Sequence, residues 1–276
     1  MKNLDYEINR ICEFIKDNVS KTESDGVIVA LSGGLDSAVV AALSTKAIGK
    51  ENVHCYFLRY NFGSLDIDKL HTDALCKKFG LTYEENSFVS KSSKTSFFNR
   101  TIRQITNTAH SFSVNKDYLH MIFGIINATR RAGYLYKKAN EHNCLVLGTT
   151  NRSELLIGCF IKFDESGCGP QPIIHLYKTE IVELAKHLGI PDEIINKVPS
   201  ADYWVYGQTN EKGLTYQKLD KILIELDKIG IDTQDCKIND ATKKEVSKCI
   251  NMVKRAKQKH KGRFPPCLEY EGFYEQ

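Results

Sequence analysis

The sequence predicts an α/β fold: an open parallel sheet with helices on both faces and further helices at the C-terminal end. Short runs of β-branched and other apolar residues alternate with longer segments of helical periodicity, which is typical of strand–helix–strand units. No solenoid repeat and no obvious linker interrupts the 276 residues, enough for one large core. We therefore expect a single domain over residues 1–276.

Four short apolar segments are predicted as buried strands, since they are rich in Val, Ile and Leu and bounded by turn residues. They are residues 27–31, 53–58, 83–89 and 144–148.

Helices are predicted where apolar residues recur every three or four positions. Residues 178–188 are the clearest case, because Leu184 and Leu188 lie on one face and Gly189 provides a stop signal. Residues 90–115, rich in Ser, Thr and Asn, are expected to form a loop with short helical pieces. The other predicted helices are residues 1–19, 38–48, 66–79, 118–140, 219–229 and 242–259.

Composition excludes several classes of protein. No apolar run approaches the ~20 residues that a membrane span needs. Nine cysteines without a C-x-x-C pair, and an N-terminus without a secretory layout, favour a reduced cytoplasmic protein. The net charge of +4 is too small to indicate a nucleic-acid partner. Residues 241–263 hold nine Lys or Arg against one acid, Glu245, which indicates either a solvated helix face or an anion-binding surface.

The loop S-G-G-L-D-S at 32–37 follows the first strand and precedes a helix. Glycines allow the backbone to approach an anion, and a helix N-terminus favours phosphate. A carboxylate such as Asp36 fits there if Mg²⁺ bridges it to phosphate oxygens. Because neither G-x-x-x-x-G-K-[ST] nor G-x-G-x-x-G is present, the loop is neither a Walker loop nor the usual dinucleotide fingerprint.

This loop resembles the pyrophosphatase loop of the ATP-pyrophosphatase superfamily, whose members adenylate a substrate oxygen and release pyrophosphate. Later segments resemble the NAD synthetase family within it, in chain order and over most of the length. They are L-G-T-T-N-R-S-E at 147–154, L-Y-K-T at 176–179, I-N-K-V-P-S-A-D at 195–202 and K-H-K-G-R at 259–263. The resemblance implies a Rossmann-like sheet and an ammonia-dependent enzyme that converts deamido-NAD to NAD.

The resemblance also implies roles for individual residues. Asp36 and Lys178 would be catalytic, and Asp36 with Glu154 would hold Mg²⁺. The acceptor substrate would contact Arg131, Lys162, His260 and Lys261. ATP would contact Ser32, Gly33, Gly34, Asp36, Ser37, Thr149, Lys178 and Ser200. Two of these positions also have plainer interpretations: Thr149 could be a helix cap, and Glu154 could favour a helix dipole.

Two positions depart from the family pattern, and both fall where the resemblance places deamido-NAD. The A-R-x-R stretch is Ala128-Thr129-Arg130-Arg131, and an acid expected at 169 is Gly169. A threonine cannot make the charged bidentate contact of an arginine.

Three functions follow as hypotheses. The first is an ammonia-dependent NAD synthetase that uses ATP and Mg²⁺, with free ammonia or a separate protein as nitrogen source, since 276 residues leave no room for a glutaminase domain. A homodimer is expected from the resemblance. The second is a divergent relative that amidates or thiolates another acceptor, with Cys159 or Cys168 as sulfur carrier. The third, a non-catalytic nucleotide-binding protein, is disfavoured because Asp36 and Glu154 are both present.

Overall fold

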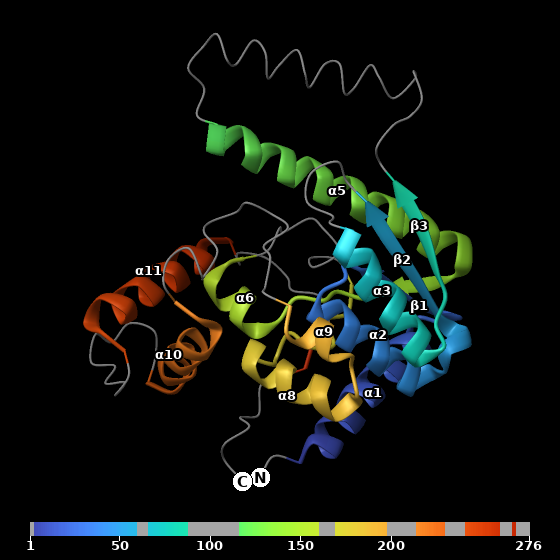
Figure 1. Ribbon diagram of the computed structural model, residues 1–276, viewed down its shortest axis with the longest axis horizontal. Helices are drawn as coiled ribbons and strands as arrows, with labels where there is room; N and C mark the ends of the chain where they lie inside the picture. Colours follow the sequence, from blue (N-terminus) through green and yellow to red (C-terminus); the bar gives the residue numbers. More distant parts are fainter. Residues whose placement is uncertain are drawn as a thin grey trace.

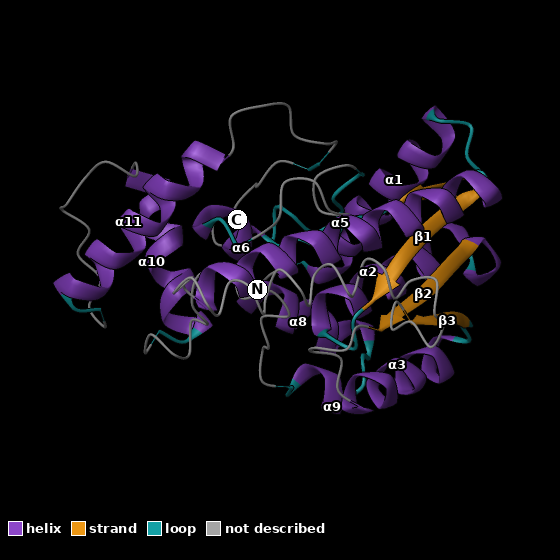
Figure 2. Ribbon diagram, turned by 90° about the horizontal axis from the view of Figure 1, so that it is seen from above, coloured by secondary structure: helices purple, strands orange, loops and turns teal. Residues whose placement is uncertain are grey.

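The computed structural model describes residues 3–59, 66–87, 116–159, 169–197, 214–229, 241–259 and 267–268. Its sheet has four parallel strands in the order β3-β2-β1-β4. They are β1 (Gly26–Leu31), β2 (Val53–Arg59), β3 (Tyr83–Ser87) and β4 (Cys144–Val146). Figure 2 shows β1, β2 and β3 side by side. The predicted α/β class and parallel sheet are confirmed.

Helices cover both faces of the sheet. On one face α2 (Leu35–Ile48) packs on β1 and β2 and is flanked by α1 (Leu4–Lys21), α3 (Asp66–Phe79) and α8 (Lys178–Leu188). On the other face α5 (Lys116–His142) packs on β1 and β4, and lies along the upper side of the sheet in Figure 1. Short turns of helix are η1 (Lys50–Asn52), α6 (Arg152–Ile157) and α9 (Asp192–Ile195).

The first strand shows why the sheet is buried on both sides. Val27, Val29 and Leu31 belong to the core beneath α1, α2 and α8, whereas Ile28 belongs to the cluster beneath α5. Side chains alternate between the faces of a strand, so an uninterrupted apolar run supplies both cores. The run at 27–31 is therefore explained by helices on both faces.

A third apolar cluster joins the C-terminal helices α10 (Tyr216–Ile229) and α11 (Lys243–Lys259). Both helices lie at the end of the molecule away from the sheet, in contact with α6 (Figures 1 and 2). Tyr177, at the start of α8, is fully buried in this cluster and connects it to the rest of the fold. No described helix has the length and apolar character to cross a lipid bilayer.

The predicted boundaries differ from the observed ones at one functional point. The helix expected at 38–48 begins at Leu35, which puts Asp36 in its first turn. Leu35 is buried, and the Ala38 amide donates to the Gly34 carbonyl at 3.2 Å. The first turn of the helix therefore begins directly after the glycines. The loop expected at 90–115 and the last two residues of the strand expected at 83–89 lie outside the described residues.

Candidate active site

Two loops meet at the carboxyl edge of the sheet. The chain leaves β1 through α2 and returns to the other side of β1 only at β4, after crossing the opposite face. In open α/β sheets, ligands bind in the crevice at such a reversal of strand order. The corresponding place in this chain lies between residues 32–34 after β1 and residues 147–151 after β4.

The first loop is closed by its own hydroxyl groups. The Ser37 hydroxyl donates to the Gly34 carbonyl oxygen at 3.1 Å and accepts from the Ser32 amide nitrogen at 3.2 Å. The Ser32 hydroxyl oxygen lies 3.1 Å from that of Ser37 and accepts from the Gly34 amide at 3.3 Å. These bonds give the loop a defined shape before any ligand arrives.

Gly33 is required by its surroundings. Its φ of +69° is in the left-handed region, and a Cβ atom there would lie 2.4 Å from the carbonyl oxygen of Asp68. Any other residue would clash with the backbone of α3 as well as being strained. The loop therefore depends on glycine for its position against α3.

Asp36 and Lys178 form an ion pair between the first turns of α2 and α8. The side chains are 18% and 9% exposed, respectively. A carboxylate is favourable at a helix N-terminus, but a cation there is not, so Lys178 needs its acidic neighbours. Burial by itself would lower the pKa of Lys178, yet the charges of Asp36 and Glu154 raise it above its ordinary value. Lys178 therefore remains positively charged.

Glu154 is the second carboxylate of the cluster. Its side chain accepts from the Asn151 amide nitrogen at 3.3 Å, and its own amide nitrogen donates to Asn151 Oδ1 at 2.9 Å. Burial and the nearby charge of Asp36 raise the pKa of Glu154 to about 8, against the opposing effects of Lys178 and Asn151. Two carboxylates that repel each other in a buried site are a suitable place for a divalent cation.

No group of three His, Cys, Asp or Glu side chains forms a metal cage among the described residues. This is compatible with Mg²⁺, which is usually held by one or two carboxylates together with substrate phosphates and water. The donor chemistry of Asp36 and Glu154 therefore fits that ion.

The structure brings some of the predicted residues together and separates others. Ser32, Gly33, Gly34, Asp36 and Ser37 lie in one loop and helix start, joined by Lys178 and Glu154 from the other side of the crevice. Outside the described residues lie Lys162, Ser200, His260, Lys261 and Cys168.

Thr149 and Arg131 have different positions. Thr149 is half-buried in the loop after β4, and Asn151 rather than Thr149 caps α6, so the capping interpretation of Thr149 is wrong. Arg131 is half-buried on α5, which covers the face of the sheet opposite α2. Its predicted contact with the acceptor stays a prediction.

The two departures from the family pattern differ in their structural setting, and packing explains the one at Gly169. The Thr129 hydroxyl donates to the Ile125 carbonyl at 3.0 Å, within exposed α5 surface. A Cβ atom at Gly169 would lie 1.8 Å from the Val146 carbonyl oxygen. This backbone approach to β4 excludes an aspartate at 169, so the missing acid follows from packing.

Three residues of the cluster had no role assigned from the sequence. The Asn151 side-chain nitrogen donates to Asp36 Oδ1 at 3.1 Å. The ring of Tyr216 lies 5.8 Å from the Lys178 ammonium nitrogen, and burial together with Glu154 and Asp36 raises the pKa of its hydroxyl. Asp220 accepts from the Ser153 hydroxyl at 2.5 Å and from the Thr179 amide at 2.8 Å. Asn151 stands in the segment 147–154, which carries the family resemblance and was the available signal.

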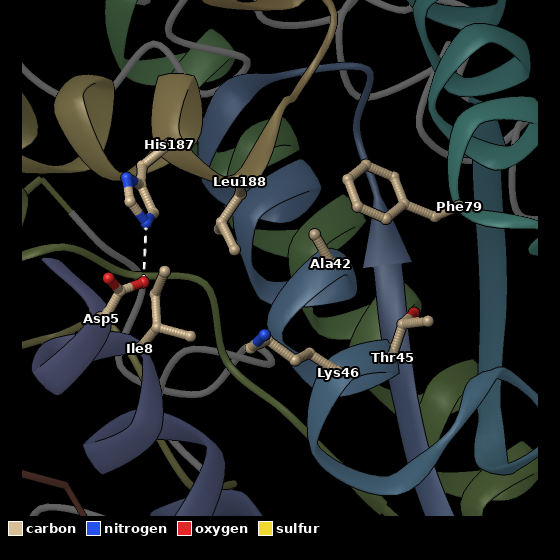
Figure 3. A pocket seen from close by; sticks show the side chains of 8 residues that line it. All are labelled: Asp5, Ile8, Ala42, Thr45, Lys46, Phe79, His187 and Leu188. Atoms are coloured by element: carbon tan, nitrogen blue, oxygen red, sulfur yellow. Dashed lines mark hydrogen bonds and ion pairs between the residues drawn. The ribbon is translucent and has the colours of Figure 1, made fainter.

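A separate surface cavity of about 370 Å³ lies between α1, α2, α3 and α8. Figure 3 shows the hydrogen-bonded pair of Asp5 and His187 at one side of this cavity, where Nε2 and Oδ1 are 2.8 Å apart. None of the predicted site residues lines it.

Comparisons with known proteins agree with the geometry. The family model described as NAD synthase matches residues 7–265. The NH(3)-dependent NAD(+) synthetase of Thermococcus sibiricus is 40% identical over 234 residues, covering 82% of this chain and 83% of that relative. The protein of the same name from Pyrococcus horikoshii is 35% identical, covering 96% and 95%.

A solved structure is also similar. It is the NH3-dependent NAD synthetase from Campylobacter jejuni in complex with the nitrate ion, which is 27% identical with a TM-score of 0.70. The match covers 97% of this chain and 100% of that one. With the family model matching most of the sequence and relatives above 30% identity over nearly its whole length, the chain belongs to the NAD synthase family.

Proposed function

We propose that this chain is an ATP-dependent, amide-forming ligase that converts deamido-NAD and ammonia to NAD, AMP and pyrophosphate. Its curated relatives carry the name of NH(3)-dependent NAD(+) synthetase. The observation that carries the proposal is the charged cluster of Asp36, Lys178 and Glu154 beside a glycine loop at the β1–β4 crevice.

The reaction takes place in two steps. A nicotinate carboxylate oxygen attacks the α-phosphorus of ATP, the bond to the β-phosphate bridging oxygen breaks, and pyrophosphate leaves. Ammonia then attacks the acyl carbon of the adenylate, loses a proton, and expels AMP. Positioning and charge stabilisation suffice for both steps, so no residue needs to form a covalent bond with substrate.

Each residue of the cluster has a task in this scheme. The Lys178 ammonium neutralises negative charge as pyrophosphate leaves. The N-terminus of α2 and the amides of the Ser32–Ser37 loop bind phosphate oxygens. Asp36 and Glu154 would hold Mg²⁺, which would supply positive charge to neutralise the phosphates. Thr149 and Ser200 contact ATP, whereas Arg131, Lys162, His260 and Lys261 contact deamido-NAD.

The organisation that we propose around this activity is simple. Residues 1–276 form one synthetase domain, two copies form a homodimer, and the enzyme acts in the cytoplasm on free ammonia or on ammonia from a separate protein. Sedimentation velocity at micromolar concentration tests the dimer directly.

The alternative of a different acceptor, or of sulfur transfer, rested on Thr129, Gly169 and the unusual segment 59–65. Of these, Gly169 has a packing explanation at the end of β4, and residues 60–65 lie outside the described residues. Cys159→Ser and Cys168→Ser should leave NAD formation within about twofold of the wild type, since an amide synthetase needs no thiol. Loss of turnover in either variant would favour sulfur chemistry.

One assay tests the proposal. The protein is incubated with Mg-ATP and deamido-NAD, with and without ammonium, and both pyrophosphate and NAD are followed. Equal amounts of NAD and pyrophosphate, both dependent on deamido-NAD, are expected. Pyrophosphate release that ignores deamido-NAD contradicts the proposed acceptor, and absence of Mg-ATP binding contradicts the whole proposal.

A further inference from the structure

Two side chains from other segments, those of His71 and Lys197, contact the carbonyl oxygen of Gly33. His71 Nδ1, on α3, lies 3.2 Å from it, and Lys197 Nζ, two residues after α9, donates to it at 3.4 Å. A carbonyl can only accept, so Nδ1 of His71 carries the proton. Residues 33, 71 and 197 are thus joined at one peptide group.

Lys197 is in turn held by Asp68. Its ammonium nitrogen lies 2.5 Å from Asp68 Oδ1, and the two side chains are 17% and 4% exposed, respectively. The backbone of Asp68 also forms the wall against which Gly33 packs. Buried ion pairs add little stability compared with apolar residues of the same volume, so stability alone does not account for this pair.

Fixing the carbonyl of Gly33 also fixes the amide that follows it. A trans peptide is planar, with C=O and N–H on opposite sides. When the Gly33 oxygen is directed toward Lys197 and His71, the Gly34 N–H is directed away from them, into the loop where it meets Ser32 Oγ at 3.3 Å. Because that amide donates to Ser32 Oγ, the orientation of the Gly33–Gly34 peptide also sets the position of the Ser32 hydroxyl in the proposed phosphate-binding loop.

We propose that Lys197, held by Asp68, and His71 are positioning residues for ATP, acting through the Gly33–Gly34 peptide. The inference rests on the proposed function of the Ser32–Ser37 loop as the phosphate-binding loop. We assign Lys197 to the loop because its ammonium contacts the Gly33 carbonyl oxygen as well as the Asp68 carboxylate. Substrate chemistry remains with Asp36, Lys178 and Glu154.

The first experiment measures Mg-ATP binding to the full chain by calorimetry, together with the KM for ATP and for deamido-NAD. Lys197→Met should raise the Kd and the KM for ATP about tenfold, the size of one charge-assisted hydrogen bond, while the KM for deamido-NAD stays within twofold. Lys197→Arg should recover most of the loss, because a guanidinium can bind both the carboxylate and the carbonyl.

Lys138→Met is the matched control. The Lys138 side chain is 20% exposed and pairs with Glu141 at 3.2 Å and Glu84 at 3.5 Å, on the α5 side of the sheet. The Lys138→Met substitution therefore removes a lysine about as buried as Lys197 from two carboxylates, and it does not alter the Ser32–Ser37 loop. Unchanged Mg-ATP affinity in Lys138→Met and weakened affinity in Lys197→Met support the proposal; an equal loss in both overturns it.

Asp68→Asn separates positioning from direct contact, and remains informative if Lys197→Met does not fold. A positioning lysine loses its anchor, so the Kd for Mg-ATP should rise severalfold. A lysine that binds phosphate directly would be released by the substitution, and an unchanged or lower Kd therefore overturns the proposal. Failure of the proposed function is distinguishable, because it would appear as absent NAD formation in the wild type, whatever its affinity for Mg-ATP.

Discussion

Asn151 and Asp36 are joined by a hydrogen bond of 3.1 Å from the Asn151 side-chain nitrogen to Asp36 Oδ1. The other end of the same amide, Oδ1, accepts from the Glu154 backbone nitrogen and caps α6. One buried side chain therefore starts a helix after β4 and orients the carboxylate that follows β1. The two functions of the amide can be separated by substitution.

Asn151→Ser is expected to impair activity more than stability. A serine hydroxyl can still cap α6, so the free energy of unfolding should change by about 1 kcal/mol or less. Because the donor to Asp36 is lost, NAD formation should fall about tenfold. Steady-state kinetics and urea denaturation check the two expectations, and wild-type turnover in a folded variant would show that Asp36 does not depend on Asn151.

Asp36→Asn should reduce pyrophosphate release by at least about 100-fold, because a neutral amide neither pairs with Lys178 nor binds Mg²⁺ as a carboxylate does. Asp227→Asn is a suitable control. Asp227 is 20% exposed and pairs with Arg152, whereas Asp36 is 18% exposed. Its substitution should lower the melting temperature and leave the KM for ATP near the wild-type value. Full activity in Asp36→Asn would remove Asp36 from the site.

Gly169→Ala tests whether position 169 is a packing position. The added Cβ would lie 1.8 Å from the Val146 carbonyl oxygen, so the free energy of unfolding should decrease by about 1–3 kcal/mol. Gly133→Ala is the matched change, because a Cβ at this helical position of α5 meets nothing within 4 Å. It should stabilise by up to about 1 kcal/mol. Equal effects of the two substitutions in urea denaturation would contradict the packing explanation.

Stability should fall as the pH drops through about 6.5, because of His175. Its Nε2 lies 2.6 Å from Glu7 Oε1, and its Nδ1 has no hydrogen-bond partner in the described part of the chain. Burial lowers the pKa of His175 below the ordinary value of 6.5, despite the opposing effect of Glu7. Just below pH 6.5, His175 therefore binds a proton in the unfolded chain but not in the folded chain. The free energy of unfolding decreases as the pH falls through this range.

Glu7 adds to this trend at lower pH. Burial would raise the pKa of Glu7, but His175 and Arg10 lower it overall, so further stability is lost as this carboxylate protonates below pH 4.5. The free energy of unfolding, measured with urea at pH 7.5 and at pH 5.5, should differ less between the two pH values for His175→Gln than for the wild type. His187→Gln, which alters an exposed pair with Asp5, should keep the wild-type difference. An unchanged difference in His175→Gln would remove His175 as the cause.

Local patterns in the sequence were sufficient for the elements and for the chemistry of the loop. The apolar run at 27–31 predicted a strand buried on both faces, and the order of strand, Gly-Gly and Asp36 predicted a phosphate-type loop at its end. Both predictions depend on residues close together in the chain, namely a continuous apolar run and a Gly-Gly turn in front of a helix. The sequence could not show that Leu35 begins the helix, because that start depends on burial against the core.

The sequence by itself determined the fold class and the family, and it predicted a phosphate-type loop after the first strand. Tertiary structure alone decided which distant groups face one another: Asn151 and Lys178 at Asp36, and Lys197, Asp68 and His71 around Gly33. It also decided that Gly169 lies against β4 and leaves no space for an acid. The physical reason is that contacts between segments far apart in the chain depend on how the sheet and helices pack, which no local pattern encodes.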